Sequence, residues 1–145
     1  ESVSKIYLTE SEYKLTKQLK LLVEKSPVSI CLFRLKFSKG KVDTALVKTN
    51  EQFLTFSGYS REEVMNWSFK DWIAVIHPLD IPGFCMKFVK ALKNEFKDTA
   101  SYLYRAKAKD GHYVWVKIMS SGIKENDEEY WIAASFLDYT NNAKS

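Results

Sequence analysis

The chain has 145 residues, of which 46% are hydrophobic and 28% charged, and its net charge is +4. This composition is typical of one globular domain with a buried core. The lysines are scattered rather than clustered with aromatic residues, which argues against nucleic-acid binding. No apolar run is long enough to cross a membrane, so we expect no membrane contact by this segment.

Two cysteines are too few for a disulfide framework. We predict that both are buried reduced thiols, Cys31 in a strand and Cys85 on the apolar face of a helix. Such cysteine usage suits a cytoplasmic protein. The chain begins with Glu-Ser-Val rather than Met, and we interpret it as a piece of a longer protein.

Residues 1–26 predict an amphipathic flanking helix. Thr9 and Glu12 match a capping box, and the helix should end before Pro27, because the residue preceding a proline avoids the helical conformation. Leucines recur along one side of this helix, at Leu8, Leu15, Leu19 and Leu22. Two interpretations stay open: the helix packs on its own domain, or it forms one strand of a dimer seam.

Residues 27–140 predict a single domain, followed at 141–145 by the start of a C-terminal linker. Strands are predicted at 28–37 and 42–49, helix starts at 49–52, 60–63 and 68–71, a longer helix ending near residue 94, and strands at 99–109, 113–124 and 130–137. Asp110-Gly111 predicts a tight primed turn. The order of strands, helices and strands predicts an α+β fold, with an antiparallel sheet and helices on one face.

Two of these elements carry apolar patterns with further consequences. The longer helix has an apolar stripe at Ile81, Phe84, Cys85, Phe88, Val89 and Leu92. The last strand is apolar on both faces, whereas a strand with one face in water should alternate. We therefore expect the N-terminal helix or a second subunit to cover the outer face of the sheet.

Four short motifs follow one another in the domain. They are Asn50 with Phe53 and Gly58-Tyr59-Ser60-x-Glu62-Glu63-Val64; His77-Pro78-x-Asp80; Arg105 to Trp115 with Asp-Gly at the turn; and Asp138-Tyr139-Thr140. In this order and spacing, residues 28–140 resemble PAS domains, the sensory and docking modules of signalling proteins. Tyr139 departs from the isoleucine that is commoner in the family.

The resemblance implies a PAS-like five-stranded antiparallel sheet with helices packed on one face. Family members sense ligands or cofactors, or dimerise, and pass a signal to a kinase, a cyclic-dinucleotide enzyme or a transcription regulator, often in a two-component system. It also implies that Asp138 and Thr140 hydrogen-bond back onto the sheet, beside Trp115, and relay the signal to an outgoing helix.

The resemblance further implies a cavity between the helices and the sheet. Its predicted wall comprises Phe53, Phe56, Trp72, Ile73, Phe84, Phe88, Tyr102, Tyr104, Ile118 and Ile132. Ligand sites are mostly apolar with a few directed polar groups, which the tyrosine hydroxyls would supply for a small apolar ligand. The alternative is a close-packed core with no space left.

The residues argue against several kinds of chemistry. His77 and His112 lie off the inner stripe of the longer helix, which argues against haem, and no metal-ligand spacing occurs. Residues 65–70 hold no cysteine where light-oxygen-voltage relatives form a flavin adduct. No nucleophile-base set and no Gly-rich phosphate loop is present, so we do not expect an enzyme. The identity of any cofactor stays open.

We therefore expect a sensory or interaction domain of a larger signalling protein, with its output domain in the same parent chain. It would bind a small ligand, form a homodimer through the N-terminal helix and the outer sheet face, or do both. The first alternative is a ligand-free structural dimerisation module. A small-molecule enzyme on a similar scaffold is a more distant one.

Overall fold

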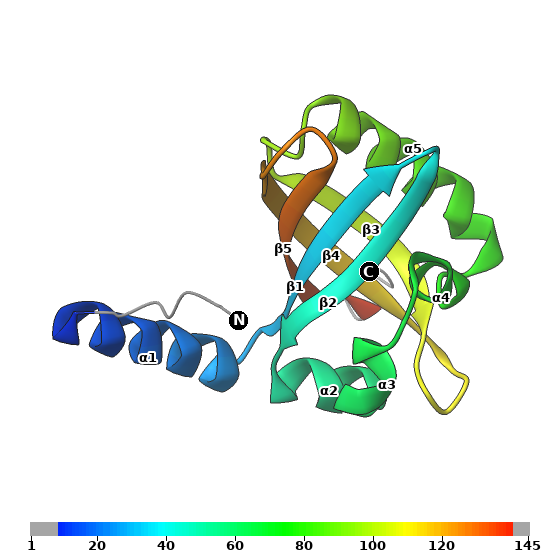
Figure 1. Cartoon of the computed structure of the whole chain (residues 1–145). Coiled ribbons are helices and arrows are strands. Elements are labelled where there is room, and N and C mark those ends of the chain that lie inside the picture. Colours follow the sequence, from blue (N-terminus) through cyan, green and yellow to red (C-terminus); the bar gives the residue numbers. More distant parts are fainter. Residues whose placement is uncertain (1–8, 141–145) are drawn as a thin grey trace.

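The computed structural model describes residues 9–140, whose strands form one antiparallel sheet in the order β2-β1-β5-β4-β3. The strands are β1 (Ser29–Ser38), β2 (Lys41–Thr49), β3 (Ala100–Lys107), β4 (Tyr113–Lys124) and β5 (Glu129–Asp138). The first strand along the chain lies beside the last one, at the middle of the sheet (Figure 1). This arrangement brings the entry and the exit of the domain close to the sheet centre.

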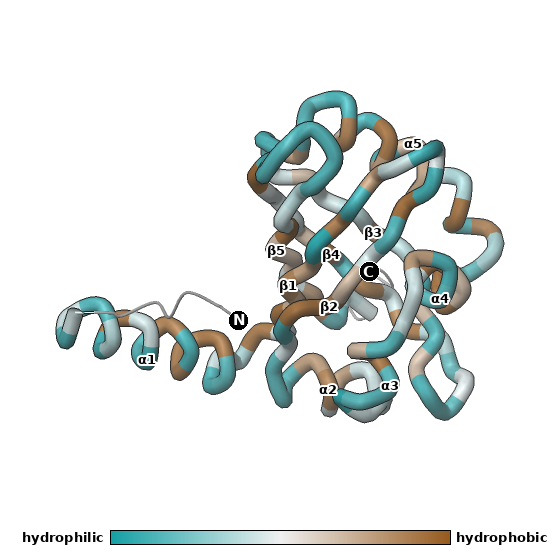
Figure 2. The backbone as a smooth tube through the Cα atoms, in the orientation of Figure 1, coloured by the Kyte–Doolittle hydropathy of each residue, from teal (hydrophilic) through white to brown (hydrophobic). Residues whose placement is uncertain are grey.

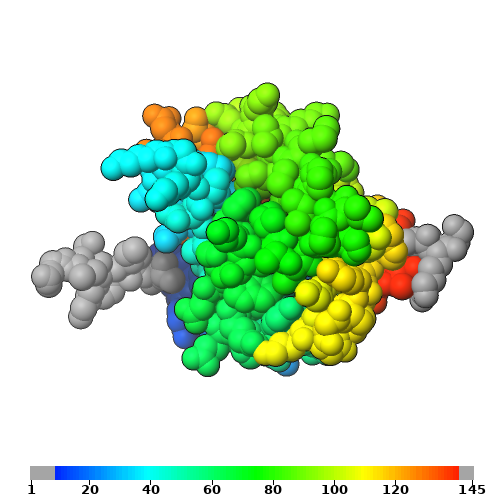
Figure 3. All heavy atoms as spheres, turned by 90° about the vertical axis from the view of Figure 1, so that its right-hand side faces the viewer, coloured from blue at the N-terminus to red at the C-terminus, as the bar shows by residue number. Residues whose placement is uncertain are grey.

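The helices between β2 and β3 pack against one face of the sheet (Figure 1). They are α2 (Glu51–Ser57), α3 (Arg61–Met65), α4 (Phe69–Ala74), the 3₁₀ helix η1 (Pro78–Asp80) and α5 (Ile81–Lys93), whereas α1 (Glu10–Lys25) precedes the sheet. Figure 3 looks onto this side, where the green helices form most of the surface and the yellow segment lies beside them. The predicted α+β fold with a five-stranded antiparallel sheet is confirmed.

Side-chain caps explain why the middle helices are short. Thr9, Ser60 and Ser68 each form a capping box with the acidic residue three positions later, at helix starts that the sequence predicts. Asn50 caps α2 by accepting from the backbone N–H of Phe53. Each cap satisfies backbone donors at the start of a new helix, so the chain changes direction repeatedly over the sheet.

The loop between β3 and β4 differs from the predicted tight primed turn. Lys107 pairs with Tyr113, so the loop holds five residues, 108–112. Gly111 has a φ of 97° and donates from its N–H to the carbonyl of Ala108, whereas Asp110 has no positive φ. The Asp110 carboxylate accepts from the backbone N–H of His112, and this local bond stabilises the wider loop.

The core lies between the inner sheet face and the helices. The buried hydrophobic side chains alternate along the strands, as Val116 and Ile118 do on β4 and Ile132 and Ala134 on β5. Figure 2 shows brown, apolar segments along the strands at the sheet centre and teal, polar loops at the sheet ends. Val114 of β4 also packs against this core.

Helix α1 does not cover the outer sheet face of its own chain, and cover by a second subunit, the other alternative we expected, stays a prediction. Helix α1 projects away from the sheet (Figure 1), and none of its residues is buried. Leu103, Met119 and Leu137 lie on the outer face with 49%, 46% and 51% of their surface exposed. The apolar pattern of the last strand indicated an outer face that favours burial. Burial also requires an element that packs on this face, and α1 extends away from the domain at Ser26 instead of folding back over the sheet.

The apolar stripe of α5 is narrower than predicted. Phe84 and Phe88 pack into the core, but Cys85 and Val89 are exposed. The core-facing side of α5 also includes the small buried Ala91, so the helix is rotated slightly from the predicted face. Cys31 is buried in β1 as predicted, whereas the prediction of a buried Cys85 is wrong.

No helix among residues 9–140 has the length and apolar character that crossing a membrane requires.

Candidate functional site

A cavity of about 150 Å³ lies between the inner sheet face and helices α2, α4 and α5. The structure places all ten residues of the predicted wall on its lining: Phe53, Phe56, Trp72, Ile73, Phe84, Phe88, Tyr102, Tyr104, Ile118 and Ile132. The space coexists with well-packed clusters on either side of it. The many aromatic side chains therefore enclose this space rather than filling it completely. That these residues bind a ligand stays a prediction.

Aromatic contacts fix the shape of the wall. The ring of Phe84 lies 5.2 Å from that of Tyr102 and meets Tyr104 edge-on at 5.6 Å, between ring centroids. On the other side, Trp72 meets Phe33 edge-on at 5.1 Å and Trp67 at 4.7 Å. Edge-to-face pairs of this kind stabilise packing beyond the area that they bury, so the wall is held by rings from both layers.

The two tyrosine hydroxyls on this wall, of Tyr102 and Tyr104, are neutral. Burial raises the pKa of Tyr104 well above the ordinary tyrosine value, and the neighbouring Tyr102 and Cys31 raise it further. Burial also raises the pKa of Tyr102, although its hydrogen bond with Ser120 partly offsets that shift. Both phenols therefore keep their protons at physiological pH, and each offers an O–H donor inside the domain.

Sequence reasoning missed several residues of the wall. Phe33, Leu35, Thr44 and Trp67 also line the cavity. Leu35 lies opposite Thr44 in the β1–β2 pair, and the Ser38–Lys41 turn fixes that register, so the pairing could have identified Thr44. Trp67 lies between two short helices, where no periodic pattern marks it.

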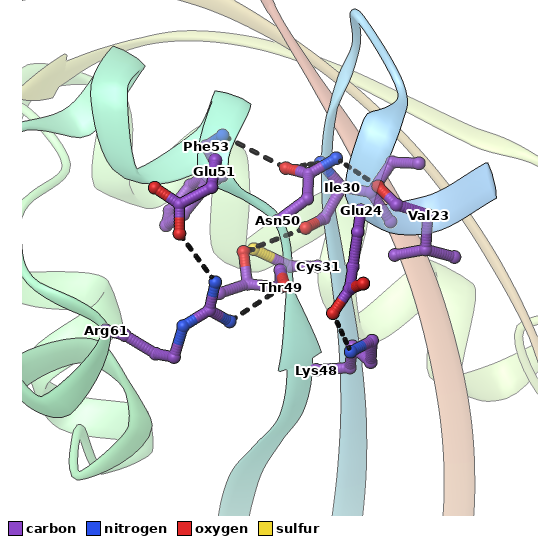
Figure 4. A network of polar contacts seen from close by, with 10 residues as sticks. All are labelled: Val23, Glu24, Ile30, Cys31, Lys48, Thr49, Asn50, Glu51, Phe53 and Arg61. Atoms are coloured by element: carbon purple, nitrogen blue, oxygen red, sulfur yellow. Dashed lines mark hydrogen bonds and ion pairs between the residues drawn. The ribbon is translucent and has the colours of Figure 1, made fainter. Parts of the chain in front are cut away.

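Asn50 connects the cavity helix α2 to α1 (Figure 4). Its side chain is completely buried. The carbonyl oxygen accepts from the N–H groups of Ile30 and Phe53, at 3.2 and 3.0 Å, and the amide nitrogen donates to the carbonyls of Val23 and Val28, both at 2.9 Å. Phe53 lines the cavity and Val23 belongs to α1, so one side chain bridges both elements.

Further contacts surround this bridge (Figure 4). The Thr49 hydroxyl donates to the carbonyl of Ile30 at 2.9 Å and lies 3.4 Å from the Cys31 sulfur. Burial raises the pKa of Cys31 to about 12, so this thiol is protonated and unreactive at neutral pH. On the surface, Lys48 pairs with Glu24 of α1 at 3.2 Å.

A second polar link joins the start of α5 to the edge strand β3. Both carboxylate oxygens of Asp80 accept from the Arg105 guanidinium at 2.9 Å, and one also accepts from the Arg105 backbone N–H. The arginine lowers the pKa of Asp80 below its ordinary value. The Asp80 side chain makes no cap hydrogen bond to α5, so its carboxylate serves the link to Arg105 instead.

The residues of the predicted relay lie together at the exit of β5. The Arg105 guanidinium lies 5.0 Å from the ring centre of Trp115. The Trp115 backbone N–H donates to the Thr140 hydroxyl at 3.2 Å, and the Thr140 N–H donates to the Asp138 carboxylate at 3.0 Å. Thr140 thus bonds back onto β4, whereas the Asp138 carboxylate bonds to Thr140 itself, and the part of both residues in signalling stays a prediction.

The predicted α1 seam and His112 occupy exposed positions, whereas His77 is half-buried. Leu15, Leu19 and Leu22 are exposed on α1, whereas Leu8 lies outside the described residues. His77 accepts from the N–H of Leu79 at the start of η1, and His112 contacts Asp110 in the β3–β4 loop. In residues 9–140, no group of three or more histidine, cysteine or acidic side chains is arranged to hold a metal ion.

Comparison with known proteins agrees with this geometry. A family model for the PAS fold matches residues 46–135, and no curated protein sequence gives a significant match. The chain is similar to the PAS domain of a protein from Colwellia psychrerythraea, with 20% identity and a TM-score of 0.67, over 88% of this chain and 98% of that one.

Two other solved structures come from signalling proteins. A PAS domain from a two-component sensor histidine kinase has 14% identity and a TM-score of 0.60, over 89% of this chain and 99% of that one. The N-terminal domain of a diguanylate cyclase with a PAS/PAC sensor, from Marinobacter aquaeolei, has 21% identity and a TM-score of 0.57, over 79% and 98%. Because the family match covers well over half of the sequence, this chain belongs to the PAS family.

Proposed function

We propose that this domain is the ligand-sensing module of a larger signalling protein, and that its ligand binds in the cavity between the helices and the sheet. The observation that carries the proposal is the cavity of about 150 Å³ lined by aromatic and aliphatic side chains, with neutral hydroxyl groups among them. An apolar pocket with a few convergent polar groups is the usual form of a small-molecule site.

A route for the signal supports the same proposal. Phe53 is part of the cavity wall, and its backbone N–H is held by Asn50, whose amide also holds the last turn of α1. A ligand that displaces α2 alters this bridge and shifts the population of α1 orientations. The exposed leucines of α1 would then carry the change to a partner subunit or to the rest of the parent chain.

The proposal extends to the parent protein. The similar PAS domains of a sensor histidine kinase and of a diguanylate cyclase are parts of signalling proteins. By analogy, we infer that the output activity resides in another domain of the parent protein, and that this PAS domain is not itself catalytic.

Native mass spectrometry with a cavity-filling variant tests the proposal. Ala134 is buried on the cavity wall, whereas its neighbour Ala133 is exposed on the opposite face of β5. The protein as purified from its own cells should carry a bound small molecule. Ala134→Leu should lose that mass, because the larger side chain occupies the cavity, and Ala133→Leu should keep it. Equal occupancy in both variants would place any ligand elsewhere.

A ligand-free dimerisation module is the second candidate. It is favoured by the exposed apolar residues on the outer sheet face and along α1. It predicts a dimer with no bound molecule and the same dimer affinity in the Ala134→Leu variant, so the same samples separate the two functions.

A further inference from the structure

Two polar atoms on the cavity wall are buried without a hydrogen-bond partner. Within residues 9–140, the only such side-chain atoms are Nε1 of Trp72 and Oγ1 of Thr44. Most buried polar groups in folded proteins are paired, and an unpaired one is destabilising. Both residues line the same cavity, Trp72 from α4 and Thr44 from β2. Their coincidence points to a ligand that pairs with them.

Three other polar side chains on the wall already have partners. The Ser57 hydroxyl accepts from the Tyr59 N–H at 3.3 Å, and the Tyr59 hydroxyl donates to the Lys107 carbonyl at 3.4 Å. Tyr102 bonds to Ser120. The buried lining atoms that lack a partner are therefore one indole N–H and one hydroxyl, and the neutral Tyr104 hydroxyl is a further donor on the wall.

Resting on the ligand-sensing function proposed above, we propose that the ligand is a neutral, ring-sized molecule with a hydrogen-bond acceptor, such as a carbonyl oxygen, that accepts from Trp72 Nε1–H. The Thr44 hydroxyl is its second polar contact. Trp72 and Thr44 are thus the residues that determine specificity, while the rings around them provide apolar contact.

Size and charge support this class of ligand. An apolar cavity of about 150 Å³ is large enough to hold benzene, so a molecule with one ring matches the space. The lining residues include a single charged one, Lys107, whose side chain is exposed. A charged ligand would lose its hydration without an opposite charge to replace it, so a neutral one is favoured.

Neighbouring rings are the competing partners for the indole N–H. Trp67 and Phe33 both meet Trp72 nearly perpendicular, at interplanar angles of 80° and 85°. A contact from N–H to a ring face is weaker than a bond to a carbonyl oxygen. A ligand oxygen would therefore bind the Trp72 indole N–H more strongly than the neighbouring rings do. This change of partner would shift the NMR resonance of the indole N–H.

Three probes of the same heavy-atom count and flat shape test the inference. Acetophenone carries a carbonyl oxygen, α-methylstyrene has a methylene group in its place, and benzoate carries a charge. Titration of the full chain, followed in proton–nitrogen NMR spectra, should show acetophenone binding about tenfold tighter than α-methylstyrene, as one added hydrogen bond implies. Benzoate should bind most weakly, and acetophenone alone should shift the Trp72 indole N–H resonance downfield.

Variants assign the preference to named atoms. Trp72→Phe should reduce the affinity ratio of the two neutral probes from about tenfold to near one, and Thr44→Val, which keeps the side-chain shape, should lower it partially. Trp131→Phe is the control, because Trp131 lies outside the cavity beside Arg34, and it should keep the ratio. A general loss of packing would weaken both neutral probes alike and leave the ratio of their affinities unchanged. The shift of the Trp72 indole resonance is measured on the wild-type protein, so it does not depend on any variant folding.

The outcomes separate this inference from the proposed function. Equal binding of the two neutral probes, or a preference that survives Trp72→Phe, overturns the inference and leaves the cavity as a ligand site. Tightest binding of benzoate also overturns it. If none of the probes binds, the inference and the ligand-sensing function both fail.

Discussion

Asn50 shows how one residue type satisfies several segments at once. A primary amide offers two donors and one oxygen with two lone pairs, and Asn50 uses all of them on backbone groups of α1, β1, α2 and the α1–β1 connection. No other side chain of similar size supplies this combination. The sequence marked Asn50 as a strand end and helix cap, but not as the bridge to Val23, since that contact depends on where α1 lies.

Replacing Asn50 by aspartate should destabilise the domain by about 3 kcal/mol, because a carboxylate loses both donors and faces two buried carbonyls. The melting temperature should fall by roughly 10 °C. Gln52→Glu is the matched control: it adds the same charge at an exposed position of α2 and should change the melting temperature little. Similar melting temperatures for the two variants would contradict the role of Asn50 as a buried bridge.

Asp80 gives a pH-dependent prediction. Its pKa is lowered from 3.8 chiefly by hydrogen bonding to Arg105, so the ion pair stabilises the fold fully at pH values above 3.8. That contribution disappears as the pH falls through the lower pKa of the folded state. Asp80→Asn should therefore cost about 2 kcal/mol of unfolding free energy at neutral pH, and the difference from the wild type should shrink in acid.

Urea unfolding across a pH series measures this effect. The exposed Asp43 provides the control, since Asp43→Asn should leave the unfolding free energy nearly unchanged at every pH. A difference between wild type and Asp80→Asn that stays constant into acid would show that the ion pair contributes nothing.

At the scale of elements, the caps and turns were predictable because their signals are local. The capping boxes at Ser60 and Ser68 involve residues three positions apart, and a sequence displays such pairs directly. The face of α5 was less predictable, because Cys85 and Val89 are apolar enough to extend the stripe but Phe84 and Phe88 fill the available space. Packing between layers, rather than periodicity, decides which edge of the stripe is buried.

A close approach between strands gives the third prediction. A Cβ atom on Gly122 of β4 would lie 2.4 Å from the carbonyl oxygen of Trp131 on β5. Gly122→Ala should therefore destabilise the domain by roughly 3 kcal/mol. Gly83 is the control, because nothing lies within 4 Å of its added Cβ and alanine favours its helix by about 1 kcal/mol.

Thermal unfolding of both alanine variants checks this expectation. Gly122→Ala should melt at a lower temperature than the wild type, and Gly83→Ala at an equal or higher one. A Gly122→Ala protein as stable as the wild type would mean that the β4–β5 pair relaxes without cost at this point.

For the whole molecule, the position of α1 is the feature that sequence reasoning did not resolve. The leucine repeat indicated a surface that favours an apolar partner, and Leu15, Leu19 and Leu22 are indeed exposed. A repeat does not identify the partner, because the same pattern suits packing in one chain or between two. The architecture of the sheet was predictable, in contrast, since several independent motifs specify the order of its elements.

We expect α1 to contribute to a homodimer. Leu19→Glu should weaken dimerisation at least tenfold in sedimentation experiments, because a charge enters an apolar seam. Lys20→Glu changes the neighbouring position, off the leucine repeat, and should have little effect. A monomer at all concentrations, or equal effects of the two variants, would rule out the seam.

The cavity is the feature on which the account depends, and a crystal of the protein pressurised with xenon tests it most directly. Xenon enters apolar cavities that contain no water, and we predict an ordered xenon atom among Phe84, Tyr104 and Val116, between α5 and the sheet. If no xenon binds and the side chains close the space, the domain has a filled core, and ligand sensing at this site is contradicted.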